Sequence, residues 1–171
     1  SAASDVYKRQ PLMMEDAYTS VKWRNDSEVF KYTGNTYNHE ITIQDELSWI
    51  KNVIQAENEY RCAIIVDNQY VGNIYLTNIG NGSAVYHIFL GEKSIWGKGV
   101  ARRASQLILK YAFDSLNLNK VELNVKMKNE RAIELYKRIG FQEYSHDEKW
   151  IHMIIVKEWV PVSYTHLRAH E

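Results

Sequence analysis

Cysteine, proline and long apolar runs are all scarce in this chain of 171 residues. Its single cysteine, Cys62, excludes an intramolecular disulfide framework and fits a reducing compartment. Its two prolines, Pro11 and Pro161, lie near the ends, so nothing between them resembles a proline-rich hinge. No segment approaches the roughly 18 consecutive apolar residues of a transmembrane helix. These absences favour one cytoplasmic domain that does not bind a membrane.

An excess of charge is missing as well. Lysine and arginine number 21, aspartate and glutamate also number 21, and the formal net charge is +0. Domains that bind nucleic acid or anionic membranes usually carry a basic excess. The balance therefore predicts neither partner, and the length suits a single domain with one core.

The two ends of the chain resemble translated adapters of a sequencing library. We expect residues 1–10 and 161–171 to be such non-native adapters, which leaves residues 11–160 as the domain. The first native strand would then be truncated, with Val6–Arg9 standing in for it at a sheet edge.

The most informative stretch is Trp96-Gly97-Lys98-Gly99-Val100-Ala101, between a β-prone run and a periodic helix. Two glycines spaced by one residue let the backbone turn tightly and expose successive N–H groups. Together with the positive end of the helix dipole, these groups form an anion site. The motif predicts a cradle for a pyrophosphate, and its alternative is a glycine-rich turn without a ligand.

The remaining pattern alternates between short helices and strands. Thr42 is the expected N-cap of an amphipathic helix that ends at Ile54. Turn residues separate the apolar runs, at 67–68 and at 78–82. We expect further elements as follows: helix 15–23, and strands 60–66, 69–77, 83–90, 120–127, 141–144 and 150–156.

A second motif follows the expected strand 120–127. Asn129 suits a helix N-cap and Gly140 suits the position after the last turn, with an apolar face between them. An Asn, then Ala, then Leu135-Tyr136, then Gly140-Phe141, placed after a Gly-x-Gly-x-Ala helix, resembles the GNAT superfamily of N-acetyltransferases. The similarity covers most of residues 12–157.

The resemblance implies a mixed, mostly antiparallel α/β sheet of about six or seven strands flanked by about four helices and splayed between strands four and five. It implies acetyl-CoA as co-substrate, with its pyrophosphate on the glycine-rich loop and its pantetheine arm along Ile88, Phe89 and Leu90. Asn129 would touch the pantetheine, or only cap its helix. Trp96 departs from the Gln or Arg usual at its position, which removes a polar contact and leaves the backbone amides.

Two residues are candidates for the proton transfers. The resemblance implies that Tyr136 protonates the departing thiolate, and the alternative is a core tyrosine. His87 would deprotonate the acceptor amine, unless strand alternation turns it to the other face or it packs as a satisfied polar residue. Glu122 on the adjacent strand and a water-relayed base remain open.

The segment after the first helix supplies candidates for acceptor binding. Trp23, Arg24, Asn25 and Tyr32 combine aromatic rings, a guanidinium and an amide. The alternative is that Trp23 belongs to the core and Arg24 pairs with a nearby acid.

The expected function is acetyl transfer to a primary amine by direct attack in a ternary complex. The acceptor is expected to be a protein N-terminus or an aminosugar nucleotide, without a metal ion, in a monomer or homodimer. The alternative is a non-catalytic acyl-CoA-binding or interaction module that has kept the fold, and thiol release from acetyl-CoA separates the two.

Overall fold

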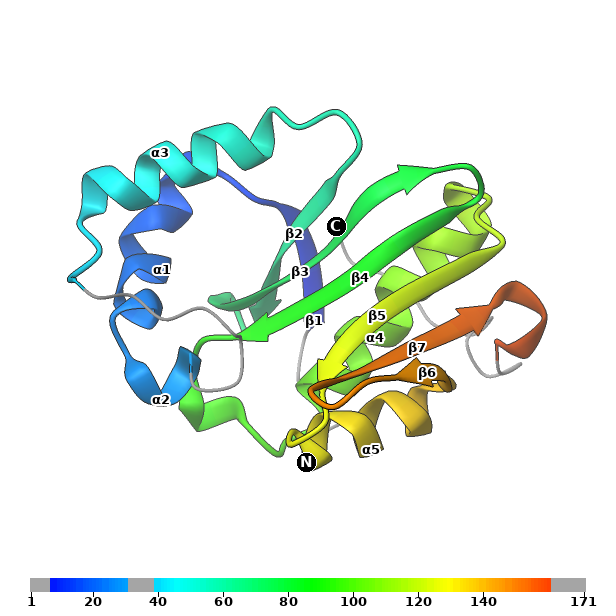
Figure 1. Ribbon diagram of the computed structural model, residues 1–171. Helices are drawn as coiled ribbons and strands as arrows, with labels where there is room; N and C mark the ends of the chain where they lie inside the picture. Colours follow the sequence, from blue (N-terminus) through cyan, green and yellow to red (C-terminus); the bar gives the residue numbers. More distant parts are fainter. Residues whose placement is uncertain (1–6, 31–38, 161–171) are drawn as a thin grey trace.

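A seven-stranded sheet forms the centre of the molecule (Figure 1). The computed structural model describes residues 7–30 and 39–160. The strand order is β1-β2-β3-β4-β5-β7-β6, and β4 and β5 form the parallel pair in an otherwise antiparallel sheet. The strands are β1 (Tyr7–Pro11), β2 (Tyr60–Val66), β3 (Gln69–Gly80), β4 (Ser83–Leu90), β5 (Lys120–Lys126), β6 (Gln142–His146) and β7 (Trp150–Val156).

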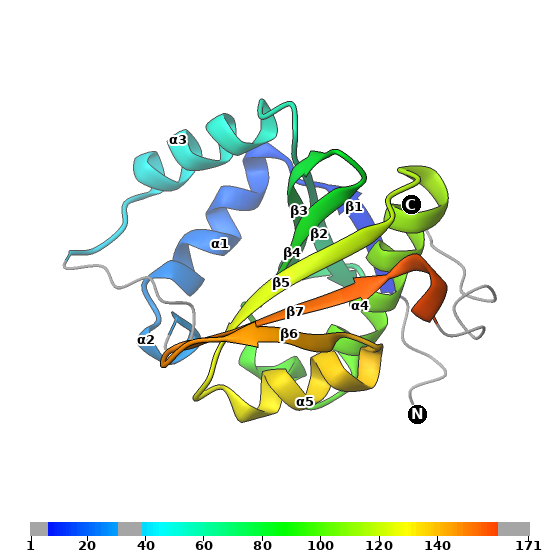
Figure 2. The same cartoon turned by 45° about the vertical axis from the view of Figure 1, so that its right-hand side comes forward.

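The helices lie on the two sides of this sheet. On one side, α4 and α5 cover the main core, whereas α1 and α3 pack against each other on the other side (Figures 1 and 2). The helices are α1 (Ala17–Arg24), α2 (Ser27–Phe30), α3 (Ile43–Ile54), α4 (Val100–Lys110) and α5 (Glu130–Ile139), with 3-10 turns η2 (Met14–Asp16), η3 (Lys93–Ile95) and η5 (Lys157–Trp159) and a π turn η4 (Tyr111–Ser115). None of the helices within the described residues has the length and apolar character to cross a membrane.

The parallel pair is short, and this shortness opens the sheet. Ser83, Ala84 and Val85 pair with three successive β5 residues, Lys120, Val121 and Glu122, and the ladder then stops. Both strands continue beyond that point, β4 to Leu90 and β5 to Lys126. The two strands therefore part like a V, with its apex at the Val85–Glu122 pair.

The outer face of the sheet is open to solvent at β5 and β7. On β5 and β7, buried and more exposed residues alternate along each strand, which is the pattern of a sheet with one packed and one solvated face. The packed side chains include Val121, Leu123 and Met153, in the core with α4 and α5. The outer face therefore carries Glu122, Asn124 and their β7 neighbours.

The fold class expected from the resemblance is confirmed, including the splay between β4 and β5. Thr42 caps α3 as expected, in a capping box with Asp45. The expected turn at 78–82 is shorter, because β3 extends to Gly80 and Asn81-Gly82 alone make the turn, both at positive φ. The short helix α2 was not expected, because four residues carry no periodicity.

A buried polar contact joins β4 to α4. The Tyr86 hydroxyl lies 2.5 Å from Ser105 Oγ, and Ser105 in turn donates to the Ala101 carbonyl at 2.6 Å. Since the serine proton is used toward Ala101, the tyrosine is the donor to Ser105. The contact fixes the second turn of α4 against the strand that borders the V.

We expect Ser105→Ala to lower the free energy of unfolding by about 1 kcal/mol, the net value of one such hydrogen bond. Tyr86→Phe should have a similar effect. In urea unfolding, the double variant should lose less than the sum of the two single variants, because both remove the same contact. Strictly additive losses would contradict the coupling.

Candidate active site

The glycine-rich loop has the geometry of an anion cradle. Gly97 and Gly99 have φ values of 76° and 82°, a region that side chains rarely adopt. Gly99 is the N-cap of α4 and offers no side chain to cap it. A Cβ at Gly99 would meet nothing within 4 Å, so the space in front of the backbone is open.

The first turn of α4 leaves amides for a ligand. Its first helical hydrogen bond runs from the Arg103 N–H to the Gly99 carbonyl at 3.1 Å. The N–H groups of Val100, Ala101 and Arg102 precede this ladder and are available to an anion. No acidic residue lies in this turn, and Lys98 is exposed beside it. These residues fit a pyrophosphate group.

The edge of β4 that faces β5 lies between the cradle and the Val85–Glu122 pair at the apex of the V. Its other edge is hydrogen-bonded to β3, where Ile88 pairs with Ile74 and Phe89 with Asn73. After Val85, the edge of β4 that faces β5 has left its ladder with that strand. The Trp96 indole donates to the Leu90 carbonyl at 3.1 Å and closes the end of the strand.

Tyr136 lies on α5 behind this edge. Its ring meets Tyr86 edge-on at 5.8 Å between centroids and Phe141 at 6.1 Å. Burial raises the pKa of Tyr136 to about 12, so the hydroxyl keeps its proton at neutral pH. Asn129 accepts from the Ala132 N–H at 3.3 Å, and so serves as the cap of α5.

His87 lies on the opposite face of β4 from Tyr86 and Tyr136. Its ring stacks on Tyr75 at 4.7 Å, and Nε2 lies 2.9 Å from Thr77 Oγ1. Burial, followed by the charge of Arg61, lowers the pKa of His87 to about 4. A base of that pKa accepts a proton weakly at pH 7. The structure therefore favours the satisfied, packed histidine over the base.

Trp23 packs beneath the loop between β4 and the cradle. The side chain is 4% exposed, and its indole N–H donates to Glu92 Oε1 at 3.0 Å. A Cβ on Gly91 would lie 2.0 Å from the Trp23 ring, so this close approach requires glycine. Sequence reasoning missed Gly91 and Glu92, because their role depends on a helix almost 70 positions earlier in the chain.

Arg24 is held in a buried ion pair. Its Nε contacts the Glu46 carboxylate, which is 1% exposed and also accepts from Ser20 Oγ at 2.7 Å. The guanidinium lies 3.9 Å above the Trp49 ring. Arg24 thus joins α1 to α3. This contact agrees with the alternative that Arg24 pairs with a nearby acid.

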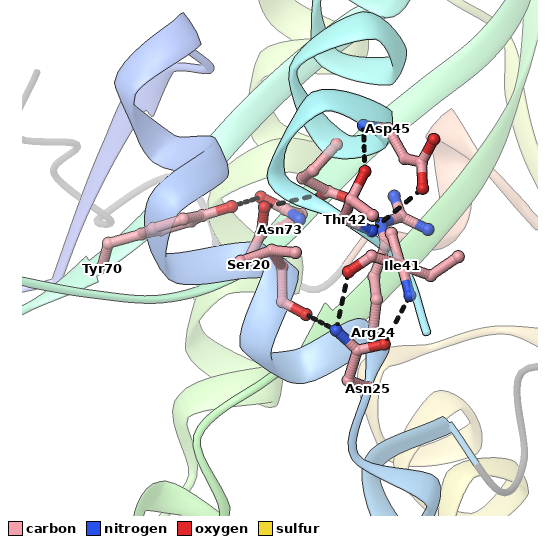
Figure 3. A network of polar contacts seen from close by, with 10 residues as sticks. Ser20, Arg24, Asn25, Ile41, Thr42, Asp45, Tyr70 and Asn73 are labelled. Atoms are coloured by element: carbon pink, nitrogen blue, oxygen red, sulfur yellow. Dashed lines mark hydrogen bonds and ion pairs between the residues drawn. The ribbon is translucent and has the colours of Figure 1, made fainter. Parts of the chain in front are cut away.

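Asn25 joins the same two segments through the backbone. Its side chain accepts from the Ile41 N–H at 2.8 Å and donates to the Ile41 carbonyl at 2.9 Å (Figure 3). These contacts make Asn25, like Trp23 and Arg24, a structural residue of the α1–α3 unit. Tyr32, the fourth candidate for acceptor binding, lies outside the described residues.

The comparisons with known proteins agree with this geometry. The model of the acetyltransferase (GNAT) domain family matches residues 10–142. The chain is 30% identical to spermidine N(1)-acetyltransferase of Escherichia coli, over 78% of this chain and 72% of that protein, and 26% identical to acetyltransferase PseH of Campylobacter jejuni, over 78% and 82%. A crystal structure of spermidine N-acetyltransferase from Vibrio cholerae with CoA and spermine superposes with a TM-score of 0.80 and 23% identity, covering 90% of this chain and 96% of the other.

This protein belongs to the GNAT family of acetyltransferases. It is an N-acetyltransferase, and the acyl donor of this family is acetyl-CoA. The open cradle at Gly97 and Gly99, with amides uncapped by side chains, fits the pyrophosphate of that donor.

We expect Gly99→Val to weaken acetyl-CoA binding strongly without unfolding the protein. A β-branched side chain disfavours positive φ and places methyl groups where the pyrophosphate would approach. Isothermal calorimetry measures the affinity, and thermal unfolding serves as the control. An unchanged affinity would show that the cradle is not part of the acetyl-CoA binding site.

We expect Arg24→Ala to lower the free energy of unfolding by about 3 kcal/mol, because it takes the ion-pair partner from buried Glu46. Arg24→Ala/Glu46→Ala should recover part of this loss. Urea unfolding provides the measurement. A stable Arg24→Ala variant with a raised KM for the acceptor would instead make Arg24 a substrate residue.

Proposed function

We propose that this N-acetyltransferase moves the acetyl group directly from acetyl-CoA to a small-molecule primary amine that enters from the open face of β5 and β7. The observation that carries the proposal is the V between β4 and β5, which is closed at the Val85–Glu122 pair and widens toward the end of β4, where the cradle follows. The names of the relatives support a small amine as acceptor.

The donor would lie along β4. With the pyrophosphate at Gly99, the pantetheine arm would run back beside β4 from Leu90 to Tyr86, a distance of about 13 Å at about 3.3 Å per residue. An extended pantetheine arm has a comparable length. The thioester then lies near Tyr86, where Tyr136 meets the strand.

The chemistry follows from this placement. A neutral amine nitrogen attacks the thioester carbonyl carbon, the new N–C bond forms and the C–S bond breaks. The Tyr136 hydroxyl gives its proton to the departing sulfur, and the proton released by the new amide nitrogen restores the phenol. The protein supplies orientation and a donor that is already in place for the developing thiolate.

A panel of acceptors tests the proposal. Thiol release from acetyl-CoA is followed with a polyamine, an aminosugar nucleotide and a peptide with a free N-terminus. We expect a small amine to have the highest kcat/KM. Turnover with the peptide alone would overturn the choice of acceptor, and binding of acetyl-CoA without transfer to any amine would favour a non-catalytic module.

We expect Tyr136→Phe to lower kcat by roughly 10²-fold, the lower end for a positioned acid. The KM for acetyl-CoA should change little, because the lost contact matters mainly in the transition state. The ring and its contacts with Tyr86 and Phe141 remain, so the melting temperature should hold. Wild-type turnover with chemistry rate-limiting would make Tyr136 a core residue.

A further inference from the structure

A glutamate at the apex of the V has a histidine of the neighbouring strand beside it, on the same face of the sheet. Glu122 of β5 and His152 of β7 each expose 26% of their side chains, and Glu122 Oε1 lies 3.9 Å from His152 Nε2. Neither residue serves the core, since both occupy outward positions of alternating strands. The function described so far uses neither residue.

Their position along the sheet places them opposite Tyr136. Glu122 pairs with Val85, the last contact before the strands part. The next residue of β4, Tyr86, points to the other face and touches Tyr136. Tyr136 and Glu122 therefore lie at the same level of the gap on opposite faces of the sheet, and His152 lies beside Glu122, one strand further from the gap.

The hydrogen bonds of His152 define which nitrogen is free. Its Nδ1 lies 3.0 Å from Asn124 Oδ1, and an amide oxygen accepts only, so Nδ1 carries the proton. In the neutral ring, Nε2 then presents a lone pair on the side of Glu122. The edge of Tyr144 packs against the ring at 5.8 Å.

The charge of Glu122 suits a cation near this lone pair. Lys120 Nζ already lies 3.1 Å from Oε1, which shows that the carboxylate takes an ammonium group. The lysine is 47% exposed, so its side chain is able to swing into water when a second ammonium arrives. A carboxylate beside an imidazole lone pair receives an R–NH₃⁺ group and also stabilises the imidazolium that forms from it.

We propose that Glu122 and His152 form the subsite that receives the acceptor ammonium, with Glu122 holding its charge and His152 Nε2 taking its proton. The inference rests on the proposed function, since it assigns the base for that same transfer. The N–H bond of R–NH₃⁺ breaks, the proton bonds to Nε2, and the nitrogen lone pair becomes free to attack the thioester. His152 later releases the proton to water.

The experiment compares four single variants in steady-state kinetics with the best amine of the panel, and a fifth, His152→Ala, is used for rescue by imidazole. His152→Gln and Glu122→Gln change the proposed subsite. His146→Gln and Glu143→Gln change a matched pair, 2.7 Å apart on the exposed strand β6, as controls. Acetyl-CoA affinity and melting temperature are measured for all four and should match the wild type.

We expect His152→Gln to lower kcat/KM for the amine roughly 10²-fold at neutral pH. In this variant, the decline of kcat/KM on the acid side of the pH profile should be weaker than in the wild type, because the proposed base has been removed. His152→Ala should regain activity with added imidazole. Glu122 and Tyr144 contact the ring and Lys120 contacts Glu122, so the profile is also recorded for Glu122→Gln.

We expect Glu122→Gln to raise the KM for the amine about tenfold, with a smaller change in kcat, because it removes a charged contact of the ground state. The inference is overturned if both variants match the two controls in kcat/KM and in pH profile while the wild type turns over. The proposed function itself fails if the wild type binds acetyl-CoA but acetylates no amine, so the two failures are distinct.

Discussion

The parting of β4 and β5 is the constraint on which the rest of the site depends. Three residue pairs hold the strands together, and the Gly82 carbonyl adds hydrogen bonds from the N–H groups of Asn119 and Lys120 at 2.7 and 3.2 Å. Beyond this clasp, β4 and β5 no longer pair with each other. In the proposed function, the acyl donor lies along β4 in this opening, so the break in the ladder and the proposed binding site are the same feature.

The two faces of the gap are supported by different means. Behind it, Tyr86, Tyr136 and Phe141 form an aromatic cluster, and the Tyr86–Ser105 contact fixes the cradle helix against the strand. In front, the α1–α3 unit is fixed by the ion pair of Arg24 and Glu46, and Trp23 holds the loop to the cradle. Trp23 thus connects α1 to the loop that leads from β4 toward Gly97 and Gly99.

The sequence predicts the elements well where a local signal exists. Thr42, Asn129 and Gly140 mark the ends of α3 and α5 because capping depends on a few neighbouring residues. Motifs also locate the cradle. Tertiary partners are not encoded locally, so the sequence does not show that Arg24 meets Glu46. For the same reason, it does not show that His152 lies across from Glu122, a neighbour that exists only once β7 inserts between β5 and β6.

Access to water decides which groups around the gap are able to exchange protons. Burial raises the pKa of Tyr136 to about 12 and lowers that of His87 to about 4, so both side chains are neutral at pH 7. A neutral Tyr136 is suited to give a proton to a thiolate, and in the proposed mechanism it regains that proton within the same reaction. The proton of the ammonium must instead leave the protein in every cycle. A buried imidazole on Thr77 is poorly placed for this release, whereas His152 on the solvated face is able to pass it directly to water. In the proposed mechanism, the asymmetry of the sheet, buried behind β4 and solvated in front of β5 and β7, would separate the two proton transfers of a single acetylation.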